Sequence, residues 1–207
     1  TPVLNTPATA GTSCREIQSD GHSAGNGTYW LTRADNALYQ AYCDMTLEGG
    51  GWTTVFAGRN GRPNQFDHFD SAAYQGICTD PATHCLRHAP PSVGDRATDI
   101  AVTCGGSAIR FPMTQPIRTW IVNGTQSDWQ PITSTRLAGS PTGLVPTQLL
   151  TGFGTNATPS MSFIVGDGTQ IGTFASSNES SASFDYCDGQ PDQVSMVRIM
   201  YREALPA

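Results

Sequence analysis

The six cysteines are the feature that most constrains how this chain can fold. Their number is even, and no two of them have the Cys-x-x-Cys spacing of many metal and redox sites, so they suit three disulfides. Four Asn-x-Ser/Thr sequons accompany them, at Asn26, Asn123, Asn156 and Asn178. Because disulfides persist in oxidising compartments, we expect a secreted or cell-surface protein whose long loops are held by disulfides. The cysteines are Cys14, Cys43, Cys78, Cys85, Cys104 and Cys187.

Length and charge exclude several classes of protein. At 207 residues, the chain has the size of one large domain. Its net charge is −6 and all 11 basic residues are Arg, so it has no basic stripe for nucleic acid or for an anionic membrane surface. No apolar run approaches the roughly 20 residues of a membrane span, and no segment has the pattern of a signal peptide. We therefore expect a soluble, processed chain with no nucleic-acid partner and no membrane insertion.

The chain is predicted to consist of a short linker and one domain. Residues 1–12 are rich in Pro, Thr and Ala and have no apolar period, which predicts a linker, with the domain over residues 13–207. At the start of the domain, Ser13 and Glu16 have the spacing of a capping box, and Asp20-Gly21 is a stop signal. These signals predict a helix of one or two turns.

The rest of the chain is dominated by strand patterns. A meander of three strands is predicted over residues 28–33, 37–45 and 51–58. The last apolar run, Val194–Tyr201, is continuous rather than alternating, which favours a central strand covered on both faces. Residues 60–99 contain Pro and Gly without a period and predict ordered loops. Further strands are predicted over residues 99–104, 108–111, 119–123, 161–165 and 170–174, and a helical turn over residues 147–150.

The opening of the domain carries a specific set of motifs. Tyr42-Cys43-Asp44-Met45 precedes Gly49-Gly50-Gly51-Trp52, with Cys14 and Gly27-Thr28-Tyr29 upstream. This set resembles the opening of the fibrinogen C-terminal-like domains. The closing Met200-Tyr201-Arg202 is similar to the last strand of the intelectins, a lectin branch that has the same opening. The resemblance implies an α+β, fibrinogen-like domain with an antiparallel sheet, short helices and a Cys14–Cys43 disulfide. The Trp-rich calcium loop of ficolins and the Cys-rich stretch of animal intelectins have no match here.

An acidic segment before the last strand is the candidate calcium site. Ca²⁺ takes about six to eight oxygen ligands, and a loop bent by Gly and Pro can point several carboxylates and carbonyls inward. The intelectin resemblance implies that the ion takes vicinal hydroxyls of a sugar while Tyr186 flanks the diol. Trp129, in a polar stretch, is a second aromatic candidate for sugar contact. The segment also suits a solvated acidic turn. The candidate calcium ligands are Asn178, Glu179, Asp185, Asp188 and Asp192.

Two weaker candidates lie in the middle of the chain. The segment Phe66–Asp70 holds two carboxylates and an imidazole, but a surface loop anchored by its Phe side chains is the favoured interpretation. His84, Cys85 and His88 could form a zinc site, but three ligands so close together in a secreted, oxidised chain disfavour it.

The four cysteines left after Cys14 and Cys43 allow three pairings. The short loop between Cys78 and Cys85 favours that pair, which leaves Cys104 with Cys187. The second bridge would connect an inner strand to the acidic segment and make that segment rigid.

An enzyme is disfavoured although Gly21-His22-Ser23-Ala24-Gly25 matches the G-x-S-x-G nucleophile elbow. An elbow needs a strand before the Ser and a helix after it, and here a helix precedes and a strand follows. The sequence thus predicts a secreted, non-enzymatic, calcium-dependent module that binds glycans. The alternative is an adhesive or structural module that binds protein, with calcium structural or absent. Because single sugar sites are weak, several copies, as in a homo-oligomer, would supply avidity.

Overall fold

The computed structural model of the chain describes residues 3–59, 96–104, 106–123, 130–138, 147–153, 159–164, 170–174 and 196–204. The helices are η1 (Pro7–Thr9), α1 (Cys14–Ser19), η2 (Leu47–Gly49) and α3 (Gln115–Asn123), where η denotes a 3-10 helix. The strands are β1 (Gly27–Thr32), β2 (Leu38–Asp44), β3 (Trp52–Arg59), β4 (Ala97–Cys104), β5 (Ser107–Pro112), β6 (Gln130–Pro131), β7 (Thr135–Ala138), β8 (Gln148–Phe153), β9 (Pro159–Ile164), β10 (Gln170–Phe174) and β11 (Met196–Glu203).

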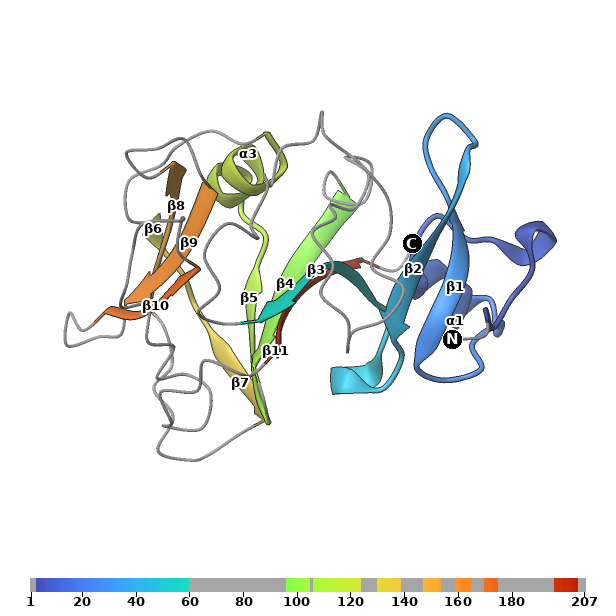
Figure 1. The fold of residues 1–207 in the computed structure, drawn as a ribbon, viewed down its shortest axis with the longest axis horizontal. Coiled ribbons are helices and arrows are strands. Elements are labelled where there is room, and N and C mark those ends of the chain that lie inside the picture. The colour runs from blue at the N-terminus through green and yellow to red at the C-terminus, as the bar shows by residue number, and fades with distance from the viewer. Residues whose placement is uncertain are drawn as a thin grey trace.

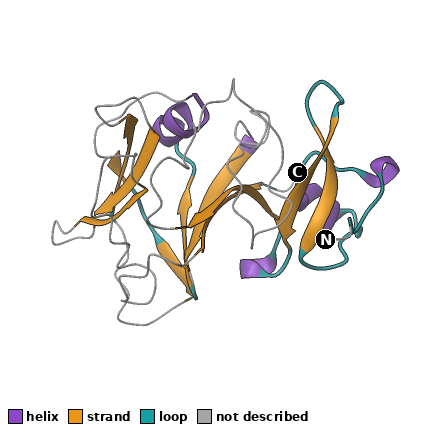
Figure 2. Ribbon diagram, in the orientation of Figure 1, coloured by secondary structure: helices purple, strands orange, loops and turns teal. Residues whose placement is uncertain are grey.

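Two antiparallel sheets organise these elements (Figure 1). The larger has seven strands in the order β1-β2-β3-β11-β4-β5-β7, and the smaller has four in the order β10-β9-β8-β6. The helices are short and lie beside the sheets (Figure 2). The predicted α+β class with an antiparallel sheet and short helices is therefore confirmed.

The last strand lies in the middle of the larger sheet. β11 is hydrogen-bonded to β3 on one side and to β4 on the other. Successive side chains of a strand point to opposite faces of the sheet, and the neighbouring Ile199 and Met200 are both fully buried. The prediction of a central strand covered on both faces is thus confirmed.

Helix α1 packs on one face of this sheet and contacts β3 and β11. Its Ile17 is buried, and the backbone N–H of Cys14 donates to Thr53 Oγ1 of β3 at 3.1 Å. In the described part of the chain, the largest fully buried side chains are Trp52, Tyr29, Phe111, Ile17, Leu31, Ile100, Ile109 and Ile117. The core therefore brings together the opening strands, the closing strand and the middle of the chain.

The start of α1 agrees with the predicted capping box in one of its two bonds. Ser13 Oγ accepts from Glu16 N at 3.2 Å, as predicted. The Glu16 carboxylate turns one residue further back, where it accepts from the Thr12 backbone N–H and from Thr12 Oγ1 at 2.7 Å. These hydrogen bonds favour the carboxylate and lower the pKa of Glu16.

The segment expected to be a linker lies against the sheet over residues 3–12. Isolated parallel bridges join Val3 to Thr28 and Gly11 to Leu31 of β1. Composition alone predicts the absence of periodic structure here, and η1 with two isolated bridges is consistent with that. Composition does not reveal the contacts between this segment and the edge of β1. The domain boundary at residue 13 stays a prediction.

Two predictions of local structure are wrong. Residues 119–123 belong to helix α3, not to a strand, because the residues before them fix the helix on the sheet: Ile117 is buried and Arg118 donates to Ala97 O of β4 at 2.7 Å. Residues 147–150 do not form a helical turn. From Gln148 onwards they belong to β8, which pairs with β9 along its whole length, so that the ladder overrides the local turn signals.

Candidate functional site

Three strand ends meet at one end of the larger sheet. The register places Met196, the first residue of β11, opposite Arg59, the last residue of β3. On the other side of β11, Val197 is opposite Cys104, the last residue of β4. We call this end of the sheet, defined by Arg59, Cys104 and Met196, the Cys104 end.

Both acidic segments singled out in the sequence are connected to the Cys104 end. The chain leaves it after Arg59 toward the segment Phe66–Asp70, and returns to it at Met196 from the segment Asn178–Asp192. The second connection starts at Phe174 of β10 in the smaller sheet, so it joins the two sheets. The topology therefore attaches two segments far apart in sequence to one end of the sheet, the end that Cys104 also occupies.

Most of the predicted site residues lie outside the described residues, and their roles stay predictions. They are the candidate calcium ligands Asn178, Glu179, Asp185, Asp188 and Asp192, the aromatic candidates Tyr186 and Trp129, and the cysteines Cys78, Cys85 and Cys187. Residues 66–70 and the disfavoured zinc candidates His84, Cys85 and His88 lie there too. The pairing of Cys104 with Cys187 is likewise untested. The described ranges contain no group of three or more His, Cys, Asp or Glu arranged to hold a metal ion.

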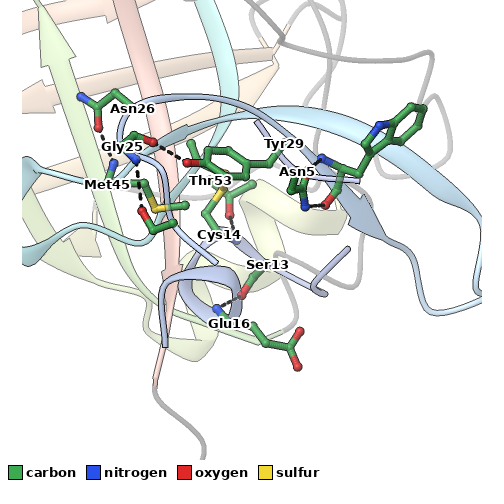
Figure 3. Close-up of a disulfide and its surroundings, with 12 residues drawn as sticks. Asn5, Ser13, Cys14, Glu16, Gly25, Asn26, Tyr29, Met45 and Thr53 are labelled. Carbon is green, nitrogen blue, oxygen red and sulfur yellow. Dashed lines mark hydrogen bonds between the residues drawn. A yellow bond between two sulfur atoms is a disulfide. The ribbon is translucent and has the colours of Figure 1, made fainter. Parts of the chain in front are cut away.

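The predicted disulfide between Cys14 and Cys43 is confirmed (Figure 3). Both residues are fully buried, with 5.6 Å between their Cα atoms. Beside them, Tyr29 Oη donates to Gly25 O at 2.6 Å and accepts from Ala24 N at 2.9 Å. The bridge ties α1 to β2, while Tyr29 holds the turn that leads into β1.

The Gly-Gly-Gly-Trp motif forms a tight turn under α1. Gly50 and Gly51 have φ of 76° and 78°, which few side chains adopt. A Cβ on Gly50 would collide with the carbonyl oxygen of Met45. Gln18 of α1 approaches the same turn and donates from Nε2 to Gly49 O at 2.9 Å. The glycines are thus required by backbone angle and by the close approach of α1.

Asp44 of the Tyr-Cys-Asp-Met motif has a structural role. Its Oδ1 accepts from Thr46 N at 3.1 Å and from Leu47 N at 2.9 Å, so it fixes the start of η2. Trp52 in turn donates from Nε1 to Leu47 O at 2.8 Å and is fully buried. These two motifs therefore build the scaffold, and the polar groups of Asp44 and Trp52 form hydrogen bonds within it.

Sequence reasoning missed a cluster of four charged side chains on the face of the sheet opposite α1. Glu48 lies 2.9 Å from Arg202 and 3.3 Å from Arg110. Asp99 lies 3.4 Å from Arg110 and 3.9 Å from Arg202. The Arg202 guanidinium also stands 4.1 Å over the ring of Trp52. The pairing of β4, β5 and β11 and the position of η2 bring these residues together, so no local pattern in the sequence could have signalled the cluster.

Near the N-terminal end of α1, Glu203 pairs with Arg96 at 2.9 Å. Burial disfavours the charged form and raises the pKa of the Glu203 carboxyl, and Arg96 opposes this effect. Burial likewise raises the pKa of Tyr201. These groups lie at the opposite end of the sheet from Cys104, since Glu203 is in register with Ala97 at the start of β4.

The serine of the G-x-S-x-G match lies in an exposed turn. Ser23 Oγ accepts from Gly25 N at 3.4 Å, with α1 before it and β1 after it. This order of helix and strand is the reverse of a nucleophile elbow. Within the described ranges, no helix is long and apolar enough to span a membrane.

Comparison with known proteins agrees with the motifs at the opening of the domain. Residues 10–76 match the family model described as "Fibrinogen beta and gamma chains, C-terminal globular domain". Among solved structures, the chain is similar to the "Fibrinogen-like globe domain of human ANGPTL6", with 12% sequence identity, 99% of this chain and 98% of that chain covered, and a TM-score of 0.42. At that identity no site residue is carried over from the human domain. The resemblance to fibrinogen-like domains is thus supported over residues 10–76, and the likeness to intelectins stays a prediction.

Proposed function

We propose that this chain is an extracellular, non-enzymatic recognition module that binds glycans with the help of Ca²⁺. The observation that carries the proposal is the fibrinogen-like match over residues 10–76, with the buried Cys14–Cys43 disulfide inside it. A buried disulfide suits a protein that folds and works in an oxidising compartment. Fibrinogen-like domains are generally recognition modules, which favours binding over catalysis.

Three of the described carboxylates, those of Asp44, Glu48 and Asp99, already have partners that disfavour calcium binding. Glu48 and Asp99 are each within 4 Å of two Arg side chains, so a cation there would have to displace guanidinium groups. Asp44 is engaged by backbone N–H groups of η2. The acidic segments connected to the Cys104 end lie outside the described residues, and their sequences hold enough carboxylates and carbonyls for a calcium shell.

Of the two acidic segments, we favour Asn178–Asp192. It supplies five candidate oxygen ligands, and Tyr186 stands among them as the aromatic residue that would flank a sugar diol. The segment also contains Cys187, and the end of the sheet to which it connects holds Cys104. A bridge between them would hold the segment rigid, and a rigid loop loses less conformational entropy when it binds an ion.

The proposal is tested by isothermal titration of EDTA-stripped protein with CaCl₂. We expect Asp185→Asn and Asp188→Asn each to weaken calcium binding by about tenfold or more, because each removes a charged ligand. The matched control is Asp67→Asn with Asp70→Asn, which removes two carboxylates from the other acidic segment and should leave calcium binding unchanged.

The outcomes separate the candidate functions. Loss of binding in the control variant alone would move the calcium site to the segment Phe66–Asp70. No calcium binding by the unchanged protein would contradict the calcium part of the proposal and leave the acidic segment as a solvated turn. Calcium binding without any glycan binding would favour an adhesive module with a structural ion.

A further inference from the structure

β1 is the edge strand of the larger sheet, and its outer edge is covered by the chain's own N-terminal segment. We call residues 3–12 the N-terminal strap. Four backbone groups on the outer edge of β1 bond to it. The carbonyl of Thr28 accepts from Leu4 N at 2.8 Å, and Thr32 N donates to Gly11 O at 2.8 Å. The remaining two belong to Trp30, between them.

A single side chain satisfies both backbone groups of Trp30. Asn5 Oδ1 accepts from Trp30 N at 2.6 Å, and Asn5 Nδ2 donates to Trp30 O at 3.0 Å (Figure 3). The amide of Asn5 thus replaces the backbone of a neighbouring strand at this position. Unpaired N–H and C=O groups on an edge strand can pair with another chain, so the strap blocks such pairing at this edge.

The strap covers this edge without being a strand itself. It is joined to β1 by two isolated bridges and by the side chain of Asn5, and between the bridges its backbone forms η1 instead of a continuous ladder. Its far end is held by Arg96, which donates to Thr12 O at 3.1 Å. Because few hydrogen bonds hold the strap to β1, a partner strand that forms a continuous ladder of backbone hydrogen bonds could displace it.

The sequence of β1 suits pairing with itself. The residues whose backbone groups face the outer edge are Thr28, Trp30 and Thr32, so the series Thr-Trp-Thr is the same when the strand direction is reversed. The strand Gly27–Thr32 has no charge and no proline. An antiparallel pair of two β1 strands around a twofold axis at Trp30 would place Trp opposite Trp and Thr opposite Thr. Such cross-strand pairs are favourable, and a twofold contact closes on itself.

An exposed apolar side chain lies on the neighbouring strand. Leu38 of β2 is 46% exposed and is the one large exposed hydrophobic side chain among residues whose side chains the structure describes. Its register partner is Thr32, the last residue of the β1 edge. Leu38 therefore lies one strand inward from the edge with which a second copy would pair.

We propose that the outer edge of β1 is a self-association edge, that the N-terminal strap closes it within one chain, and that release of the strap lets β1 pair with β1 of a second copy. This proposal is independent of glycan or calcium binding.

The test uses the full chain with Leu4→Pro and Asn5→Ala combined. Leu4→Pro removes the N–H that bonds Thr28, and Asn5→Ala removes both bonds to Trp30. By size-exclusion chromatography with light scattering, we expect this variant to show twice the mass of the unchanged chain at the same concentration. The matched control is Thr6→Ala, because Thr6 bonds only to Thr9 inside the strap and its loss leaves the edge covered.

A second variant tests where the copies meet. Adding Thr32→Pro to the loosened chain removes one N–H from the outer edge, whose bond partner is Gly11 of the strap, and leaves the β2 side intact. We expect it to restore the mass of the unchanged chain. Hydrogen exchange on the amides of Trp30 and Thr32 reports whether the strap has been released. A loosened chain with fast-exchanging edge amides and unchanged mass would overturn the proposal, as would a dimer that survives Thr32→Pro.

Discussion

Replacing Cys14 and Cys43 together by alanine is expected to lower the free energy of unfolding by about 3 to 4 kcal/mol. The bridge closes a loop with a sequence separation of 29. In the unfolded chain, this cross-link removes conformational entropy that the variant would regain. In the folded chain, it ties α1 to β2, so that the helix keeps its place on the sheet.

Chemical denaturation in non-reducing buffer measures this effect, followed by far-UV circular dichroism. The double variant is the appropriate one, because a single substitution would leave a buried thiol without its partner. The unchanged protein in reducing buffer should lose at least this much stability, because reduction opens the Cys14–Cys43 bridge together with any bridges among the other four cysteines. A loss below about 1 kcal/mol in the double variant would contradict the account of the opening as a cross-linked scaffold.

Trp52→Ala is expected to be as damaging, with a loss of about 3 to 5 kcal/mol. The Trp52 ring is fully buried and packs with Ala101 and Met200 on the sheet, with Leu47 against it. It also lies beneath the guanidinium of Arg202. Removing the ring would leave a cavity and take away the surface on which both η2 and Arg202 rest.

Trp52→Phe is the control that separates the ring from its hydrogen bond. Phe keeps an aromatic surface under Arg202 and loses the bond from Nε1 to Leu47 O, so we expect a smaller loss of about 1 to 3 kcal/mol. Urea denaturation of the two variants side by side measures the difference. If Trp52→Ala and Trp52→Phe lose the same free energy of unfolding, the packing of the ring does not stabilise the turn. The lost hydrogen bond alone would then explain the result.

The scaffold was predictable where its signals are local. Cys14, the Tyr-Cys-Asp-Met strand and the glycine turn all lie within the first third of the chain, and the structure confirms the meander and the disulfide there. Helix α3 was missed because the β-branched run at its end favours a strand, whereas Thr114 and Pro116 at its start carried the helix signal. Thr114 O accepts from Arg118 N at 2.9 Å, so the turn at Thr114 does begin the helix.

Contacts between distant residues could not be read from the sequence. Glu48 and Arg202 are 154 positions apart and meet only because β11 inserts between β3 and β4. The strap was missed for a related reason: Asn5 mimics a strand with its side chain, and that leaves no periodic pattern. For the candidate site, the sequence supplied residue types, and strand register supplied the end of the sheet to which both acidic segments connect.

The central proposal, calcium-supported glycan recognition, is tested most directly by a glycan array probed with the same protein in EDTA and after Ca²⁺ is restored. The account predicts binding to glycans with vicinal hydroxyls in Ca²⁺, no binding in EDTA, and no binding in either buffer by Tyr186→Ala. The aromatic control is Trp120→Phe, which changes a residue of helix α3, far in sequence from the acidic segment, and should leave binding in Ca²⁺ intact. Equal signals with and without Ca²⁺, or none in either condition for the unchanged protein, would contradict it.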